Sequence, residues 1–309
     1  MFLETNISLM GTIIRCGVDH DESEWLLDQV FQKLKNYEKV FSANNANSLL
    51  MSINQQAGVS AIQVPDELYK LIDIGKQASL DKDDLLNIAV GPLVKLWHVG
   101  FSDAKLPNDG QISAVLPLID PQKIQLDAKS KTIFLSEKGM ELDLGALAKG
   151  YFADAIIRFI KEKGATSGFI DLGGNILTFG DNPNNAEGFW KIGIQNPMLP
   201  RGNYVKVLNL KNNSVVTSGI YERQLIVDGK KFHHIFDSQT GYPVESDLSS
   251  LSIISDKSLD GEIWTTKLFG KSAVQVINQV NQLDGIEAIV ITKDHQMAFT
   301  NQVATRYLK

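Results

Sequence analysis

The sequence lacks the features that mark several large protein classes. Its only cysteine among 309 residues is Cys16, so neither an internal disulfide nor a site built from several cysteines can form. Zinc-finger and iron–sulfur sites of that kind are thereby excluded. No run of about 18 consecutive apolar residues occurs, which is the shortest length expected of a membrane-spanning helix. The sequence therefore predicts no membrane span.

Basic residues are also too few and too scattered for nucleic-acid binding. Lys and Arg number 30 against 36 Asp and Glu, and the net charge is −6. Because no basic cluster suited to phosphates occurs, we expect no nucleic-acid partner. The first residues contain an acid and lack a basic start, an apolar stretch or a cleavage site. This predicts a cytoplasmic protein, unless an export signal was removed before residue 1.

The apolar residues that are present fall into helical patterns in several segments. They make up 43% of the chain, an ordinary globular proportion with enough material for a substantial core. Spacing of three and four residues predicts amphipathic helices over residues 24–40 and 65–80. A loop leading into a third helix is predicted over residues 143–161, and a final helix over about 266–283.

Short apolar runs bounded by Gly, Asn, Asp and Pro predict strands. These runs are residues 168–172, 189–194, 205–210, 214–217, 224–227, 251–255, 286–292 and 296–300. Asp228 and Gly229, between residues 225–227 and 231–233, predict a tight hairpin turn, because both tolerate positive φ. The pattern indicates a mixed α+β chain with much antiparallel pairing rather than a regular βαβ alternation. We expect one compact domain over residues 1–309, either undivided or with two lobes.

The first segment that suggests chemistry is residues 143–154, with the sequence DLGALAKGYFAD. A glycine-bearing turn that enters a helix offers free backbone amides and the positive end of a dipole, to which Lys149 adds a charge. An anionic ligand such as phosphate is therefore indicated. The alternative is an Ala-rich surface helix with a solvated lysine.

Two further segments carry glycines and polar groups. In residues 170–176 (IDLGGNI), paired glycines follow a strand and permit close approach to a ligand, although an ordinary turn is the favoured interpretation. Residues 216–223 (VTSGIYER) and 233–243 (HHIFDSQTGYP) bring hydroxyls, two histidines and a glycine turn within a short stretch. This set supplies hydrogen-bond donors and a group that can titrate near neutral pH.

The last segment is residues 258–266, with the sequence SLDGEIWTT. Glu262 and Thr266 stand four residues apart, so on a helix they share a face and can bind one hard cation. Oxygen ligands favour magnesium or calcium over zinc. The alternative is a helix start in which Asp260 is the cap and Glu262 complements the dipole.

Taken together, these segments resemble the ApbE-like family of FAD:protein FMN transferases along nearly the whole chain. The order and spacing of the motifs carry the resemblance. They are Met10-Gly11-Thr12, Phe41-Ser42, Asn47-Ser48, Ile53-Asn54, Val90-Gly91-Pro92-Leu93-Val94, Leu96-Trp97, the 143–154 segment, Asp171-Leu172-Gly173-Gly174-Asn175, Trp190-Lys191-Ile192-Gly193-Ile194 with Pro197, Thr217-Ser218-Gly219 and residues 234–241. The resemblance implies an ApbE-like, T-fold-like α+β fold of largely antiparallel sheets with packed helices.

The resemblance also implies the chemistry. FAD would bind with its pyrophosphate near Lys149 and a bound Mg²⁺, and a Ser or Thr hydroxyl in the flavinylation motif of an acceptor protein would attack the FMN-side phosphorus and release AMP. His234 would accept the hydroxyl proton, with Lys149 as the second catalytic residue. The implied metal ligands are the Ala146 carbonyl, Glu262 and Thr266. The implied FAD contacts are Met10, Thr12, Gly91, Lys149, Asp154, Thr217, Ser218, Gly219, His234, Ile235, Thr240 and Gly241.

Two departures from the family pattern leave alternatives open. The family usually places Asp four residues before the metal-binding threonine, where this chain has Glu262, and Asp260 is the alternative ligand. Ser238 replaces a proline of the histidine-containing motif, which loosens a turn without removing a chemical group. Two other activities remain open: hydrolysis of FAD to FMN and AMP, and FAD binding without catalysis.

Overall fold

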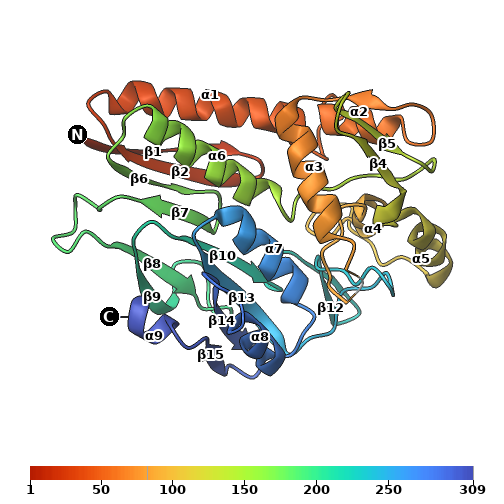
Figure 1. Cartoon of the computed structure of the whole chain (residues 1–309). Coiled ribbons are helices and arrows are strands. Elements are labelled where there is room, and N and C mark those ends of the chain that lie inside the picture. The colour runs from red at the N-terminus through yellow and green to blue at the C-terminus, as the bar shows by residue number, and fades with distance from the viewer. Residues whose placement is uncertain (82, 309) are drawn as a thin grey trace.

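The computed structural model describes residues 1–81 and 83–308, and its central feature is an eight-stranded sheet (Figure 1). In spatial order the strands are β1 (Phe2–Leu9), β2 (Thr12–Asp19), β6 (Ser167–Asp171), β7 (Asn175–Phe179), β10 (Ser214–Gly219), β13 (Leu248–Ser255), β14 (Glu287–Thr292) and β15 (Met297–Phe299). Every neighbouring pair is antiparallel. The predicted α+β class with antiparallel pairing is confirmed.

Helices cover one face of this sheet. They are α1 (Ser23–Phe41) along β1 and β2, α6 (Ala148–Glu162) over β6 and β7, α7 (Ser258–Leu268) over β10 and β13, and α8 (Ala273–Val280) beside β14. The predicted apolar stripe of α1 faces inward, and Leu26, Val30 and Leu34 are fully buried. These helices are the layer on which the candidate site is built.

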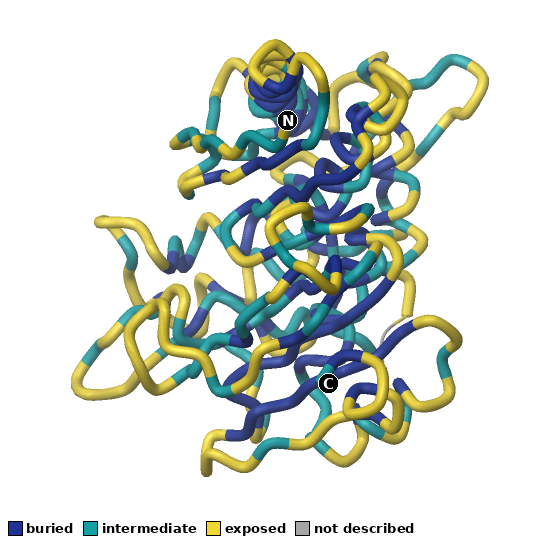
Figure 2. The backbone as a smooth tube through the Cα atoms, turned by 90° about the vertical axis from the view of Figure 1, so that its left-hand side faces the viewer, coloured by how far each residue is buried: buried dark blue, intermediate teal, exposed yellow. Residues whose placement is uncertain are grey.

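The other face of the sheet is covered by the β8 (Trp190–Gln195) and β9 (Tyr204–Leu210) hairpin together with α9 (Val303–Arg306). All residues of β13 and β14 are buried, because both faces of the sheet are covered there. Figure 2 shows that buried stretches concentrate in the layered centre, whereas exposed residues concentrate in the loops.

A second group of elements packs beside the sheet, at the right of Figure 1. It comprises α2 (Leu49–Gln55), α3 (Asp66–Ala78), α4 (Gly91–Trp97), α5 (Asp109–Val115), the short helices Leu116–Leu118 and Pro121–Lys123, and the sheet of β3 (Ile62–Gln63), β5 (Thr132–Leu135) and β4 (Ile124–Asp127). One buried apolar cluster includes residues of α1, α3, β5 and α6, so this group shares its core with the helical layer. The sequence predicted α3. It did not predict the helices and strands around α3, because they are too short to give a periodic apolar pattern.

The hairpin of β11 (Gln224–Val227) and β12 (Lys230–His233) has the predicted turn. Val227 pairs with Lys230, and Asp228 and Gly229 adopt φ values of 49° and 76°. Positive φ at both central residues is the geometry that the strand twist favours.

The prediction of one helix over residues 266–283 is wrong, because two helices occupy this region. Helix α7 begins earlier, at Ser258, and ends at Leu268, and α8 starts after Ser272. Ser272 and Gln275 form a capping box, a local signal that starts a new helix. Thr266 therefore lies in the last turns of α7 rather than at a helix start. Among all the helices described, none is long and apolar enough to cross a bilayer.

Candidate active site

The candidate site lies where α7 packs against the first turn of α6. Gly150 permits this contact, because a Cβ there would lie 2.6 Å from the Ser258 carbonyl oxygen and 2.7 Å from Glu262 Cγ. Glu262 and Thr266 both lie on α7, four residues apart, as the sequence predicted. The close approach brings Glu262 to Lys149, the residue that precedes Gly150.

Glu262 is a carboxylate in a nearly closed environment, with 5% of its surface exposed. Its Oε1 accepts a 2.8 Å hydrogen bond from Asn175 Nδ2 and lies 3.8 Å from Lys149 Nζ. Burial raises the pKa of Glu262, while Lys149, Asn175 and the Gly150 backbone amide oppose that rise. The positive end of α6 and Lys149, which we predicted to attract an anion, thus face this carboxylate.

Asp154 on α6 holds the beginning of α7. Its two carboxylate oxygens accept hydrogen bonds from the backbone amides of Ser258 (2.8 Å) and Leu259 (3.0 Å). No side chain of α7 caps the helix itself, so Asp154 satisfies amides that would otherwise lack partners. Burial raises the pKa of Asp154, and the two amide hydrogen bonds oppose the rise. The expected contact of Asp154 with FAD stays a prediction.

The paired glycines form a turn, which was the favoured interpretation. Asp171 Oδ1 accepts hydrogen bonds from the amides of Gly173 (3.0 Å) and Gly174 (2.8 Å), whose φ values are 79° and 96°. A Cβ on Gly173 would overlap Thr12 Oγ1, so the turn touches the end of the β1–β2 hairpin. The turn therefore joins the Met10 to Thr12 motif to Asn175, the partner of Glu262.

His234 follows β12 and is held neutral. Burial, helped by the nearby charges of Arg223, His233 and Lys149, lowers its pKa to about 4, although the hydrogen bond to the Arg223 backbone opposes this shift. Its Nδ1 lies 3.4 Å from the Arg223 carbonyl oxygen. Because a carbonyl can only accept, this pairing favours a proton on Nδ1 and leaves Nε2 as an acceptor.

The Thr217-Ser218-Gly219 motif forms the end of β10. Val216 faces α7, since a Cβ on Gly261 would lie 2.6 Å from Val216 Cγ2. Side chains alternate along a strand, so Ser218 faces the same side and Thr217 the opposite one. Thr217 Oγ1 is 2.7 Å from Ser252 Oγ on the neighbouring strand. The two hydroxyls that were predicted to contact FAD thus lie on different faces of the sheet.

Three other predicted FAD contacts serve packing in this structure. Gly91 begins α4 and lies against Glu141, whose carbonyl oxygen would be 2.6 Å from a Cβ on Gly91. Gly241 has a φ of 76°, and its carbonyl accepts a 3.0 Å hydrogen bond from Trp97 Nε1. Ile235 packs in the apolar cluster beneath β13 and β14. Contacts of these residues with FAD stay predictions.

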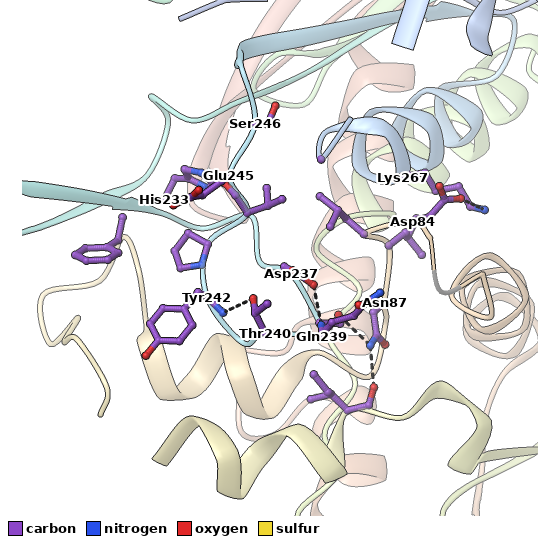
Figure 3. A pocket seen from close by; sticks show the side chains of 18 of the residues that line it. Asp84, Asn87, His233, Asp237, Gln239, Thr240, Tyr242, Glu245, Ser246 and Lys267 are labelled. Carbon is purple, nitrogen blue, oxygen red and sulfur yellow. Dashed lines mark hydrogen bonds and ion pairs between the residues drawn. The ribbon is translucent and has the colours of Figure 1, made fainter. Parts of the chain in front are cut away.

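A cavity of about 2120 Å³ lies elsewhere (Figure 3). Of the predicted site residues only Thr240 lines it, and Thr240 Oγ1 there accepts a hydrogen bond from the Tyr242 amide. Its wall also includes the ion pair of Lys267 with Asp84 (2.9 Å). His233 lies in the wall as well, and both of its ring nitrogens have backbone hydrogen-bond partners. We assign the candidate site to the junction of α6 and α7, because the buried Glu262 carboxylate faces Lys149 there, and both residues belong to the predicted set.

Three residues of the site were absent from our predicted set. Asn175 ends the Asp171–Asn175 motif, whose paired glycines predict a turn but no partner for the Asn175 side chain. Ser258 binds Asn175, and nothing in the sequence indicates a contact across 83 residues. Arg223 acts electrostatically on His234 and on Asp143, the half-buried residue that begins the turn into α6. Its position beside a hairpin gave no signal by itself.

Comparisons with known proteins show the family to which the chain belongs. The chain matches the ApbE family over residues 10–290. It is 39% identical to the FAD:protein FMN transferase of Klebsiella pneumoniae (strain 342) over 300 residues, which cover 97% of this chain and 92% of the relative. Identity to the FAD:protein FMN transferase of Treponema pallidum (strain Nichols) is 33%, over 96% of this chain and 86% of the relative.

Solved structures share the fold of this chain. The ApbE protein of Thermotoga maritima superposes with a TM-score of 0.87 and 25% identity, covering 98% of both chains. The flavinyl transferase ApbE of Pseudomonas stutzeri has the same fold, with a TM-score of 0.83 and 24% identity over 99% of this chain and 96% of that one. These matches confirm the resemblance found in the sequence: the chain belongs to the ApbE family and is a transferase.

Proposed function

We propose that this protein transfers the FMN half of FAD to a Ser or Thr hydroxyl of an acceptor protein, depends on magnesium and releases AMP. The names of the relatives support FAD as donor and a protein as acceptor. The observation that carries the proposal is the meeting of Lys149 with the buried Glu262 at the start of α6, with neutral His234 within electrostatic reach of Lys149. This arrangement provides a cation for a diphosphate, a carboxylate for a metal ion and a proton acceptor.

The groups at the junction fit a hard divalent cation. Magnesium prefers oxygen ligands, and Glu262 supplies a carboxylate. Among the described residues, the Ala146 carbonyl and the Thr266 hydroxyl have no hydrogen-bond partner, which leaves both oxygens able to bind an ion. Ala146 lies in the turn three residues before Lys149, and Thr266 lies one helical turn after Glu262. We propose these three residues as the ligands.

A site of this kind differs from the common clusters of charged ligands. Within residues 1–81 and 83–308, no three His, Cys, Asp or Glu side chains gather as a metal site. The proposed set instead uses one carboxylate, one carbonyl and one hydroxyl. When bound, the ion would neutralise charge on the phosphoryl oxygens and so stabilise the transition state.

Glu262 is a better candidate ligand than Asp260. Two residues along a helix correspond to a rotation of roughly 200°, so the two acids point to different sides of α7. Asp260 interacts electrostatically with Lys257 and Asp256 at the beginning of the helix, whereas Glu262 faces Lys149. The shift from the family's usual aspartate to glutamate is accommodated by Gly150, which leaves room for the extra methylene.

In the proposed transfer, His234 and Lys149 have different roles. The acceptor oxygen forms a bond to the FMN-side phosphorus of FAD, the bond between that phosphorus and the bridging oxygen breaks, and AMP leaves. The hydroxyl proton goes to Nε2 of His234, which is free to accept because the imidazole is neutral. Lys149 balances charge on the diphosphate as a point cation.

The proposal is tested with FAD, Mg²⁺ and a peptide that carries an Asp-x-x-Ser/Thr-Gly-Ala-Thr motif. We expect the peptide to gain the mass of one FMN less water, with one AMP released for each modified peptide. Free FMN without peptide modification would instead identify a hydrolase. Tight FAD binding with no AMP release in magnesium would identify a non-catalytic flavin protein.

Matched variants test the ligand assignment. Glu262→Ala should abolish FMN transfer while FAD binding persists, because most predicted FAD contacts lie on other elements. Asp260→Ala is the control on the same helix and should keep most of the activity. An inactive Asp260→Ala beside an active Glu262→Ala would show that the assignment is wrong.

A further inference from the structure

We propose that Asn175 is the positioning residue of Glu262: its side-chain amide holds one oxygen of the carboxylate and so aims the other at the metal ion. The inference rests on the proposed function only in taking Glu262 as a metal ligand. Asn175 itself is fully buried and begins β7, 87 residues away from Glu262 in the sequence.

The direction of the Asn175 amide is fixed by its second partner. Ser258 Oγ donates a 2.6 Å hydrogen bond to Asn175 Oδ1, and Asn175 Nδ2 donates the 2.8 Å bond to Glu262 Oε1. An amide turned by 180° would place an oxygen against the carboxylate and lose its attraction for it. Ser258 therefore selects the orientation in which the NH₂ group faces Glu262.

Contacts with neighbouring elements fix the positions of Ser258 and Asn175. The backbone amide of Ser258 donates to Asp154 of α6, which fixes Ser258 relative to that helix. Asn175 pairs with Val216 of β10, whose side chain faces α7, so the Asn175 side chain faces the same helix. The Gly173–Gly174 turn that precedes Asn175 sets where β7 begins.

A carboxylate that binds a metal ion through one oxygen has a higher affinity for the ion when a hydrogen bond holds the other oxygen. Binding a metal ion restricts the rotation of a free Glu side chain and so costs conformational entropy. A carboxylate that a hydrogen bond already fixes has lost that freedom before the metal binds. Hydrogen bonds to ligating side chains orient them, and their loss commonly weakens metal affinity by about 10- to 100-fold. Asn175 is placed to act on Glu262 in this way.

The test measures Mn²⁺ affinity directly on the purified protein, by isothermal titration or by the electron paramagnetic resonance signal of free Mn²⁺. Asn175→Ala should weaken Mn²⁺ binding about 10-fold or more, and Ser258→Ala should weaken it less, because the amide remains but can turn. FAD affinity should change by less than about twofold. In activity assays the metal concentration at half-maximal rate should rise more than kcat falls.

A buried hydroxyl on the same strand provides the control. Thr178 is 1% exposed, and its Oγ1 binds the Asn213 carbonyl away from Glu262. Thr178→Val should lower the thermal midpoint without changing Mn²⁺ affinity. If Asn175→Ala does not fold, Ser258→Ala keeps the test decisive, because it removes only one hydroxyl.

A double-mutant cycle separates positioning from general destabilisation. In a Glu262→Ala background, Asn175→Ala should have almost no further effect on Mn²⁺ affinity. Equal effects in both backgrounds, or unchanged Mn²⁺ affinity in both single variants, would overturn the inference. A wild-type protein that binds no Mn²⁺ would also overturn it, whereas one that binds Mn²⁺ without flavinylating the peptide would refute only the proposed function.

Discussion

At the scale of single residues, one missing side chain lets two helices meet. Gly150 sits where α6 touches Ser258, Leu259 and Glu262, and a Cβ would lie within 2.8 Å of an atom of each. Two of the atoms involved are backbone atoms, which cannot rotate away. The position therefore requires glycine although its backbone is ordinary helix.

We expect Gly150→Ala to destabilise the fold by about 1–3 kcal/mol and to weaken Mn²⁺ binding, because α7 must move away from α6. Urea unfolding and Mn²⁺ titration would measure the two effects. Gly110→Ala in α5 is the matched control, since its Cβ would come no closer than 3.3 Å to a side chain. That change should be neutral or stabilising, and a similar loss in both variants would contradict the argument.

His234 provides a pH prediction at the same scale. Its pKa is about 4 in the folded protein, against about 6.5 in an unfolded chain. Between these values the unfolded chain binds the additional proton, so this residue's contribution to stability is complete above about pH 6.5 and is lost as the pH falls towards 4. His233, whose pKa burial also lowers, adds to the same trend.

The expected outcome is a smaller acid loss of stability in His234→Gln than in the wild type. Urea midpoints at pH 7.5 and 5.0 would show it, with a residual slope from His233. An identical pH dependence in the two proteins would mean that His234 is accessible to protons in the fold.

At the scale of elements, α7 is held at both ends by acids from other segments. Asp154 binds its first amides. At the other end, Asp84 forms ion pairs with Lys267 (2.9 Å) and Lys271 (3.4 Å), and only 5% of the Asp84 side chain is exposed. The helix that carries the proposed ligands is thus fixed along its length.

Asp154→Ala should cost about 1–3 kcal/mol, because it leaves two amides at the start of α7 without acceptors. Asp154→Asn, which keeps one acceptor oxygen, should cost less. Hydrogen exchange should become faster at the Ser258 and Leu259 amides and remain unchanged in α8. If instead FAD affinity fell sharply with no change in stability or exchange, Asp154 would act mainly as a ligand contact.

At the scale of the whole molecule, Trp97 joins the α4–α5 region to the segment that carries His234. It is fully buried, packs on Phe232, Phe236 and Tyr242, and donates to the Gly241 carbonyl. The position of the histidine therefore depends on packing between parts that are distant in the sequence.

We expect Trp97→Phe to lower the free energy of unfolding by about 1–3 kcal/mol through the lost hydrogen bond and smaller volume. The rate of AMP release should fall as well, because the His234 segment loses a support. Trp25→Phe is the control, since Trp25 is 46% exposed on α1. Equal loss of activity in both variants would speak against a specific role for Trp97.

The sequence by itself determined what depends on local periodicity and local turn chemistry. The apolar stripe of α1, the runs that form β6, β8, β9, β10, β11, β13, β14 and β15, and the Asp228-Gly229 turn were predicted, because each is decided by neighbours within a few residues. The long helix expected over 266–283 failed, since Ser272 and Gln275 form a local cap that the apolar pattern concealed. The order of the motifs along the chain also indicated the family.

Only the tertiary structure decided which groups meet. Asn175, Ser258 and Glu262 form one network across the sheet and α7, and Asp154 serves a helix that begins 104 residues later. Strand alternation and close helix contact at Gly150 determine these encounters, and no spacing in the sequence encodes them. The physical reason is that burial and hydrogen bonding of a charged side chain depend on the elements packed around it rather than on its neighbours in the chain.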